Sequence, residues 1–356
     1  MQGDMHFYGT YALARIAGFQ PGQARTVATA AQFVNDAVET GPVYLRGRAY
    51  ILPVASAHSL LELGDRFDRM DQWRVWVPFH FLPGGRGALA EDRLVCLWGD
   101  PGNEAADAVI RLALKAGADK VGFALHLLGI VAHTLEDTYA HYGFSGIAHG
   151  NNRIDERTVN ALNAQTMRPH IEKTFDSFRE RLSASFEEVT LLGHAGAATF
   201  PDRPYLKWSF RYETPPPVAA DYLEGPRDNP ATYMRACTRL HAVFHAFIAG
   251  MTGLPAEGHR PFSPAAAREI GVILATEGRL EERCDRWRRG IESGLLFEPE
   301  TEDLNVLYAP GTWGMRSLAS APLIEDSDAY RFNRAARHYL EAMHDDILPR
   351  MGILER

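Results

Sequence analysis

The side chains best suited to chemistry lie in one segment, residues 123–146, with the sequence FALHLLGIVAHTLEDTYAHYGFSG. His133, Asp137 and His141 follow one another at intervals of four residues, so a helix would place them on one face. His126, seven residues before His133, falls on nearly the same face. Imidazole nitrogens and a carboxylate that converge in this way suit zinc, iron or manganese. The apolar neighbours indicate burial, where unpaired polar groups are costly, so the stripe predicts a metal site rather than four separately hydrogen-bonded core residues.

Further ligands must come from other segments, because one helix supplies only one wall of a site. The candidates are His6 in the polar start of the first helix, Asp36 on an otherwise apolar face of the second, His58 among small residues, His80 in VWVPFHFLPGG and His194 in LLGHAGAATFPDRP. For each of them taken singly, a structural or solvated role is the alternative.

A long irregular stretch, about 193–230, holds many glycines and prolines, including Pro215, Pro216 and Pro217. Loops of this length inside a compact protein usually have a function or link two parts. Arg203 and Lys207 lie within it beside aromatic residues and are candidates for binding a phosphate group; packing of the loop itself is the alternative. We expect residues 197–228 to cover the mouth of the metal site.

Helical periodicity dominates the rest of the chain. We expect helices at 4–17, from Pro21 onward, from about Ser56, and at 103–116, 119–142, 155–188, 229–250, 263–277, 279–292 and 327–346. Residues 42–55 and 73–83 are rich in Val, Trp, Tyr and Pro and are predicted to be extended or irregular. The prediction is a mainly α fold in one domain over 1–356: a helical bundle around the 119–142 helix, with at most a small hairpin near 43–80.

Composition narrows the class of protein. The chain has 356 residues, of which 46% are hydrophobic, and a net charge of −8, so binding of nucleic acid through bulk electrostatics is not expected. Three widely spaced cysteines favour neither a disulfide framework nor a thiolate zinc site. The start of the chain lacks the features of a signal peptide, and the longest apolar stretch, 121–132, is too short for a membrane span. These features predict a soluble, cytoplasmic protein, and they specify no oligomeric state.

Two family resemblances rest on these motifs. The opening DMHFYGTYALARIAGF, then QFVNDA, SAH, PFHFLPG, ALHLLGIVAHTLEDTYAHYGFSGI and GHA with PDRPYLKW resemble an uncharacterised bacterial family, domain of unknown function 6765, over most of the chain. A looser resemblance is to the all-helical superfamily of zinc-dependent phospholipase C and S1/P1 nuclease.

The looser resemblance implies a cluster of metal ions. It would make ligands of His6, Asp36, His58, His133 and Asp137, with Asp137 as the bridging carboxylate, and His194 as part of a later pair. Two features depart from that superfamily: His141 follows Asp137 by four residues rather than six, and the amino-terminal tryptophan is absent. We therefore expect fewer than three ions or a rearranged site, in which the amine of Met1 is a weak candidate ligand.

The leading hypothesis is a metal-dependent hydrolase that acts on a small or lipid-like phosphoester. A metal-activated water would be the nucleophile, Asp36 and Asp137 the catalytic carboxylates, and Arg203 and Lys207 the substrate-binding residues. Glu136 is a second candidate for orienting the water. Zinc is the first choice of metal, with iron and manganese as alternatives. Two other classes stay open: an interaction or sensory protein with a structural metal, and an iron oxidase or oxygenase.

Overall fold

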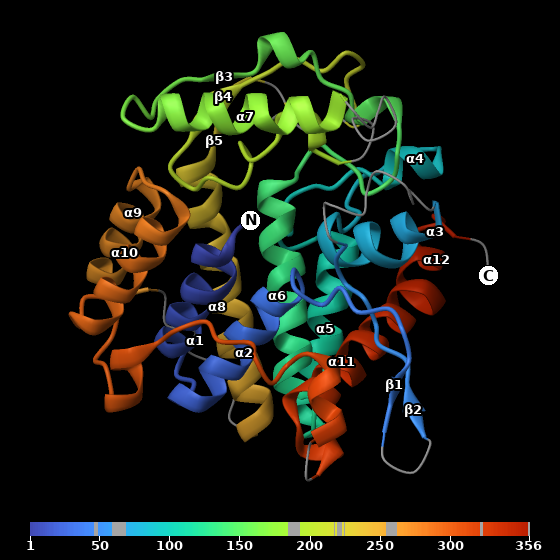
Figure 1. Ribbon diagram of the computed structural model, residues 1–356, viewed down its shortest axis with the longest axis vertical. Helices are drawn as coiled ribbons and strands as arrows, with labels where there is room; N and C mark the ends of the chain where they lie inside the picture. The colour runs from blue at the N-terminus through green and yellow to red at the C-terminus, as the bar shows by residue number, and fades with distance from the viewer. Residues whose placement is uncertain are drawn as a thin grey trace.

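A computed structural model describes residues 1–45, 49–58, 69–183, 193–216, 218, 223, 225–253, 262–320 and 323–354. The protein is mainly helical, as predicted, and α6 (Ala124–Ala140) lies at its centre. Four helices pack around α6, namely α2 (Pro21–Phe33), α5 (Glu104–Ala118), α8 (Asn229–Thr252) and α11 (Asp328–Ala342) (Figure 1). The central helix predicted over 119–142 is therefore confirmed, with shorter bounds.

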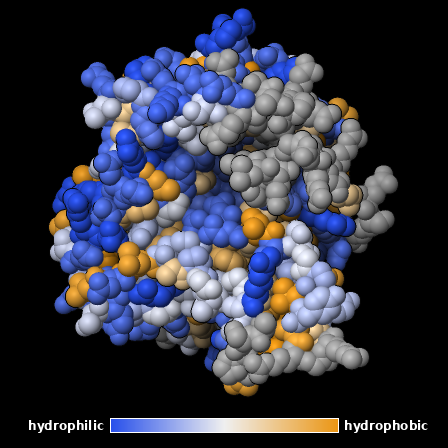
Figure 2. All heavy atoms as spheres, viewed as in Figure 1, coloured by the Kyte–Doolittle hydropathy of each residue, from blue (hydrophilic) through white to orange (hydrophobic). Residues whose placement is uncertain are grey.

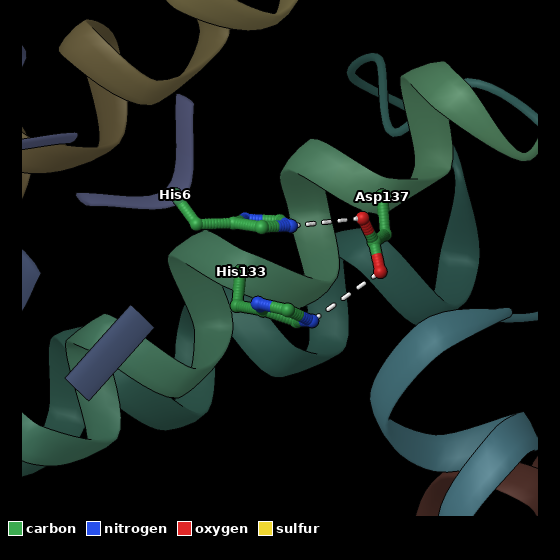
Figure 3. Close-up of side chains that lie close together, drawn as sticks. All are labelled: His6, His133 and Asp137. Atoms are coloured by element: carbon green, nitrogen blue, oxygen red, sulfur yellow. Dashed lines mark ion pairs between the residues drawn. The ribbon is translucent and has the colours of Figure 1, made fainter. Parts of the chain in front are cut away.

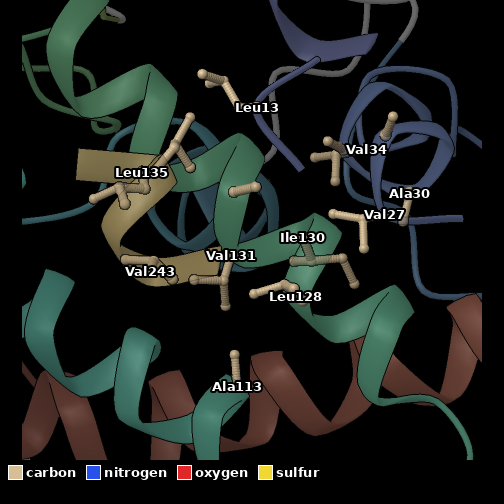
Figure 4. Packing of buried hydrophobic residues seen from close by; sticks show 14 of the residues in the cluster. Leu13, Val27, Ala30, Val34, Ala113, Leu128, Ile130, Val131, Leu135 and Val243 are labelled. Atoms are coloured by element: carbon tan, nitrogen blue, oxygen red, sulfur yellow. The ribbon is translucent and has the colours of Figure 1, made fainter. Parts of the chain in front are cut away.

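Helix α6 is buried along nearly its whole length, and α2 approaches it closely at Gly129. A Cβ atom on Gly129 would lie 2.5 Å from the Cβ atom of Ala30 and closer still to the carbonyl oxygen of Val27. Figure 4 shows Val27 and Ala30 of α2 beside Ile130 of α6 in this core. The small residues of α2 and a glycine in α6 thus allow the two helices to pack almost backbone to backbone.

The chain begins next to the C-terminal end of α6. A π-helical segment η1 (Asp4–Gly9) leads into α1 (Thr10–Ala17), which ends at Gly18 in the left-handed conformation (φ 107°). The first helix also contacts α8, and η1 contacts α10 (Leu280–Glu292). Figure 1 places the amino terminus beside the end of α6, so the first residues of the chain lie inside the bundle.

A second layer lies across that end of the bundle. It contains α7 (Arg168–Ser183) and a small antiparallel sheet in the order β3-β4-β5, with β3 (Asn160–Ala161) paired to β4 (Lys207–Ser209) and β4 to β5 (Arg227–Asp228) (Figure 1). The layer has its own hydrophobic cluster, in which Trp208 and Tyr205 are almost completely buried. The layer therefore covers the end of α6 that carries Asp137 and is followed by His141.

Three expectations about local structure are wrong. The stretch 73–83, predicted to be extended or irregular, is helical to His80 as η2 (Gln72–His80), even though Pro78 lies within it. The helix predicted over 155–188 begins only at Arg168, so residues 155–167 precede α7. The β3-β4-β5 sheet lies outside 43–80, where at most one small hairpin was expected. The hairpin predicted near 43–80 is confirmed as β1 (Val43–Tyr44) paired with β2 (Tyr50–Ile51). The Trp- and Val-rich composition of 73–80 reflects burial in a helix, because β-branched and aromatic residues fill cores of either kind.

The remaining elements are short or peripheral. They are α3 (Arg69–Asp71), α4 (Ala90–Arg93), η3 (Gly150–Asn152), η4 (Glu156–Thr158), η6 (Ala195–Ala197), α9 (Pro264–Ala275), η8 (Thr301–Asn305), η9 (Met315–Ser320), η10 (Ile324–Asp326), η11 (Met343–Ile347) and α12 (Leu348–Arg350).

The surface seen in Figure 2 mixes broad hydrophilic areas with small hydrophobic patches. Of the helices in the described part of the chain, none is long and apolar enough to cross a membrane.

Candidate metal centre

Three predicted ligands meet at the C-terminal half of α6. The rings of His6 and His133 stack with their centroids 3.9 Å apart, and each directs Nε2 toward the carboxylate of Asp137 at 3.3 Å (Figure 3). None of the three side chains is more than 1% exposed. The i, i+4 spacing on α6 aligns His133 with Asp137, and η1 brings His6 to them from the start of the chain.

His80 adds a third ring to this group from the end of η2. Its Nδ1 lies 3.2 Å from Asp137 Oδ2 and 3.3 Å from His133 Nε2. Its Nε2 donates a hydrogen bond to the carbonyl oxygen of Ser56 at 2.8 Å. Because a carbonyl only accepts, Nε2 of His80 carries a proton, and Nδ1 is the nitrogen that faces Asp137 and His133.

A second group forms immediately beyond the end of α6. His141, His194 and Asp202 each offer a ligand atom within 4.8 Å of the others. His141 Nδ1 donates to the carbonyl oxygen of His80 and His194 Nδ1 to that of Ala198, so Nε2 of each ring stays available to the group. His141 Nε2 lies 3.5 Å from Asp202 Oδ1.

The amine of Met1 connects the two groups. It lies 2.6 Å from Asp137 Oδ1 and 3.2 Å from Asp202 Oδ1, and its side chain is buried. Burial alone would lower the pKa of this amine, but the two carboxylates outweigh it and raise the pKa to about 10. The sequence interpretation, which gave the Met1 amine little weight, missed this arrangement.

His6 is held by a second carboxyl group on α6. His6 Nδ1 and Glu136 Oε2 are hydrogen-bonded at 2.5 Å, and the hydroxyl of Thr10 donates to Glu136 Oε1 at 2.6 Å. His6 Nε2, although 3.3 Å from Asp137, makes no hydrogen bond and is fully buried. Glu136 therefore orients the ring of His6, as carboxylates behind metal-binding histidines commonly do.

Burial sets the charge of these groups. It lowers the pKa of His133 and His194 to about 4 and that of His6 well below its usual range, so these rings are neutral at pH 7. Burial would raise the pKa of Asp137, but His141 and the Met1 amine hold it well below its usual range. The rings of His6, His133 and His194 are thus neutral and Asp137 is ionised, which is the protonation state in which such groups bind metal ions.

The residues of both groups fall within the stretch 1–347, which matches the model of a family described as a family of unknown function, DUF6765. The chain belongs to this family. No curated protein and no solved structure matches the chain significantly.

Two of the predicted ligands lie outside both groups. Asp36 follows α2, accepts a hydrogen bond from the Tyr308 hydroxyl and lines a separate cavity of about 320 Å³. His58 has its Nε2 3.5 Å from the carboxylate of Asp71. The helix expected from Ser56 does not include residues 56–58, and its continuation over 59–68 lies outside the described residues.

The remaining candidates contact their own surroundings. Arg203 is 4% exposed and donates to the hydroxyls of Thr199 and Tyr205, whereas Lys207 is exposed and pairs with Asp228. His126 bonds Asp328 at the opposite end of α6 and does not join the metal ligands.

Sequence reasoning missed Asp202 as a ligand, although it lies in the PDRP motif eight residues after His194. The sequence indicated only His194 as a ligand in this segment, with Arg203 and Lys207 as candidates for binding phosphate and the remainder as a loop over the site. In the structure the same segment supplies two side chains of the second group, so part of the loop belongs to the site itself.

Proposed function

We propose that this protein is a metal-dependent hydrolase of phosphoesters, with one divalent ion held by each of the two groups. The observation that supports it most is that four imidazole rings converge on two carboxylates, with ring nitrogens of His6, His80, His133 and His141 lying 3.2–3.5 Å from oxygens of Asp137 and Asp202. Imidazole nitrogen and carboxylate oxygen are the ligand atoms that divalent ions such as zinc take from proteins. A cation bound among them would offset the cost of burying the two carboxylates.

The charge of the centre supports a cation as well. Asp137 and Asp202 are both ionised and buried or nearly so, and the amine of Met1 lies against both of them. Burial raises the pKa of Glu136 well above its usual range, so the hydrogen bonds and positive charge around this carboxyl group do not offset the cost of removing it from water. Ions bound at His6 and at His141 would offset the cost of burying these carboxylates.

The ligand types favour zinc, with iron and manganese as alternatives, because imidazole nitrogen and carboxylate oxygen suit these ions. When bound, such ions supply a lowered pKa for water and polarisation of a phosphoryl oxygen. Asp137 would be the carboxylate closest to both groups, because its Oδ2 lies 3.7 Å from His141 Nδ1 and the Met1 amine joins its Oδ1 to Asp202.

The chain's own residues divide the remaining tasks. Both oxygens of Glu136 are engaged by His6 and Thr10, so Glu136 orients a ligand rather than water. Asp36 lies in another cavity and is not in our ligand set. Asp202 is 13% exposed, the most exposed carboxylate of the centre, so we place the substrate on its side. Arg203 and Lys207 stay predictions for contacts to the phosphate group.

One observation favours a structural ion at the first group. His6 and His133 are completely buried, and a closed shell of protein ligands is typical of structural sites. If the first ion is structural and the second is reactive, loss of the first ion should lower stability, whereas loss of the second should lower activity.

The experiment compares metal content, stability and hydrolysis in three variants. We expect Asp202→Asn to abolish hydrolysis of bis(4-nitrophenyl) phosphate with little loss of stability. Asp137→Asn should lower bound metal, activity and melting temperature together. The control is Asp303→Asn, because Asp303 is equally buried and pairs with Arg15 away from the centre, so it should lose stability but keep its metal.

Wild-type protein that contains no zinc, iron or manganese after purification, and shows no thermal shift when these ions are added, would overturn the metal site. Wild type that binds metal but hydrolyses neither this diester nor 4-nitrophenyl phosphate, with both ions inaccessible to chelator, would support the structural role instead.

A further inference from the structure

A buried arginine on α10 reaches the first residues of the chain. Arg283 is 2% exposed; its Nε donates to Asp4 Oδ2 at 2.6 Å, a terminal nitrogen donates to the side-chain carbonyl of Gln2, and the other terminal nitrogen donates to the carbonyl oxygen of Gly278 at 3.0 Å. The guanidinium therefore ties residues 2 and 4 to the start of α10 through side chains distant in sequence.

Gln2 and Asp4, the two residues that Arg283 holds, lie in the sequence between Met1 and His6, which both contact Asp137. Met1, whose amine meets Asp137 and Asp202, precedes Gln2, and the backbone N–H groups of Met5 and His6 both donate to the carbonyl oxygen of Gln2 at 2.9 Å. The position of Gln2 thus determines where the amine and the ring of His6 lie. Chain termini are usually mobile, and η1 has no side-chain cap to fix its first turn.

We propose that Arg283 is a positioning residue: by holding Gln2 and Asp4, it keeps the amine of Met1 and the ring of His6 against Asp137. The role in metal binding rests on the proposed function, whereas the fixing of the terminus does not. A buried ion pair contributes little net stability compared with well-packed apolar residues of the same volume. Stability alone therefore does not explain the pair of Arg283 and Asp4, whereas a role in positioning the first residues does.

A matched pair elsewhere in the molecule serves as the control. Arg15 on α1 donates from Nε to the fully buried Asp303 at 2.9 Å and also bonds Glu300 and the carbonyl oxygen of Phe19. This pair joins α1 to η8, and its partners are separate from residues 1–6. Loss of either arginine removes the cation that faces a buried carboxylate, but only the loss of Arg283 should release the amino terminus.

The first measurement is the reactivity of the Met1 amine toward reductive methylation, read by peptide mass spectrometry under native conditions. The sequence has four lysines, and Lys115, whose side chain is exposed and pairs with Asp119 at the surface, is an internal reference for a solvent-accessible amine. In the wild type and in Arg15→Met, Met1 should be protected relative to Lys115. In Arg283→Met and in the milder Asp4→Asn, Met1 should react at a rate that approaches that of Lys115.

The second measurement is zinc titration of the same proteins after chelation. In Arg283→Met, affinity at the first group should fall by about 10–100-fold, as is usual when a residue that supports a ligand is removed. The second group, which needs His141, His194 and Asp202, should still bind its ion. Arg283→Lys restores a cation for Asp4 but only part of the fork, so it should recover part of the affinity.

The outcomes separate the two proposals. If Met1 stays protected in Arg283→Met and Asp4→Asn, and both ions bind as in the wild type, Arg283 has no positioning role, while the hydrolase proposal is unaffected. If the wild type binds no ion but Met1 becomes reactive only in the Arg283 and Asp4 variants, the hydrolase proposal fails and the fixing of the terminus stands. Equal exposure of Met1 in Arg15→Met would show that only general loosening had been measured.

Discussion

Replacement of Gly129 by alanine tests whether the close packing of α2 on α6 positions the metal centre. The added Cβ atom would lie 2.5 Å from the Cβ atom of Ala30 and 3.0 Å from the backbone nitrogen of Ala31, and closer still to the carbonyl oxygen of Val27. Ordinary contacts begin at 3.4 Å, so α2 and α6 must separate by about 0.9 Å at this level. His133 lies one helical turn further along the same helix.

The free-energy change has two opposing parts. Overpacking of a core costs about 1–3 kcal/mol, and the upper end applies because two of the three nearest atoms belong to the backbone and cannot rotate away. Alanine in a helix is favoured over glycine by about 1 kcal/mol. We therefore expect the free energy of unfolding to fall by about 2 kcal/mol, a large fraction of the stability of most domains.

The displacement also bears on metal binding, because a binding constellation must be held within about 0.5 Å of its productive geometry. A shift of about 0.9 Å between the helices exceeds that tolerance and should weaken binding at the group of His6, His133 and Asp137. Urea denaturation in the presence of chelator measures the stability change alone, and zinc titration of the folded variant measures the second effect.

Gly271→Ala is the matched control, because Gly271 also lies within a helix, α9, and its added Cβ atom would meet only the flexible end of Met234 at 3.7 Å. This variant should be more stable than the wild type by up to about 1 kcal/mol and should bind zinc normally. Equal stability of the two alanine variants would refute the steric argument. Loss of stability in Gly129→Ala without weaker zinc binding would show that the centre tolerates movement of α2.

Two further predictions concern the surroundings of the centre. Arg227 lies over the ring of Tyr142 at 3.6 Å and donates to the carbonyl oxygen of Tyr142 and the hydroxyl of Tyr212. Arg227→Met should therefore lower the free energy of unfolding, measured by urea titration, by about 2–4 kcal/mol. A change below about 1 kcal/mol would show that these contacts contribute little to stability. Burial raises the pKa of all three cysteine thiols, that of Cys284 to about 12, and a thiol is neutral below its pKa. Iodoacetamide at pH 8 should therefore leave the native protein unmodified. Rapid labelling of Cys284 would contradict this prediction.

The helical part of the centre was predictable because its signal is periodic. His133 and Asp137 are four residues apart within an apolar segment, and this spacing can place both side chains on one buried face of a helix. The unusually polar start of the first helix likewise indicated His6. In both cases the sequence places a polar group where the structure is apolar, and the cost of burying that group requires a partner.

The other side chains carry no such local signal. His80 lies in a segment predicted to be extended, and only its place at the end of η2 brings it to Asp137. Asp202 lies among turn-forming residues, where an aspartate usually needs no explanation. For Asp36 the local signal was present but pointed to the wrong partner. A lone carboxylate on an apolar helix face suggested a metal ligand, but Asp36 lies just past the end of α2 and accepts a hydrogen bond from the Tyr308 hydroxyl. A polar residue near a helix end can thus be satisfied by a distant segment that no local pattern reveals.

The place of the centre in the fold also favours a cation. Asp137 lies in the last turn of α6 and His141 immediately follows the helix, so the partial negative charge of the helix C-terminus adds to that of Asp137 and Asp202. In the structure the Met1 amine lies in this field, in contact with both carboxylates. An ammonium group and a metal ion are alternatives at such a position, because an amine binds a metal only after it has lost its proton. The first residue of the chain thus lies where a divalent ion would bind, and the segment from Gln2 to His6 holds its amine there, so that the amine, once it has lost its proton, would be a further ligand beside Asp137.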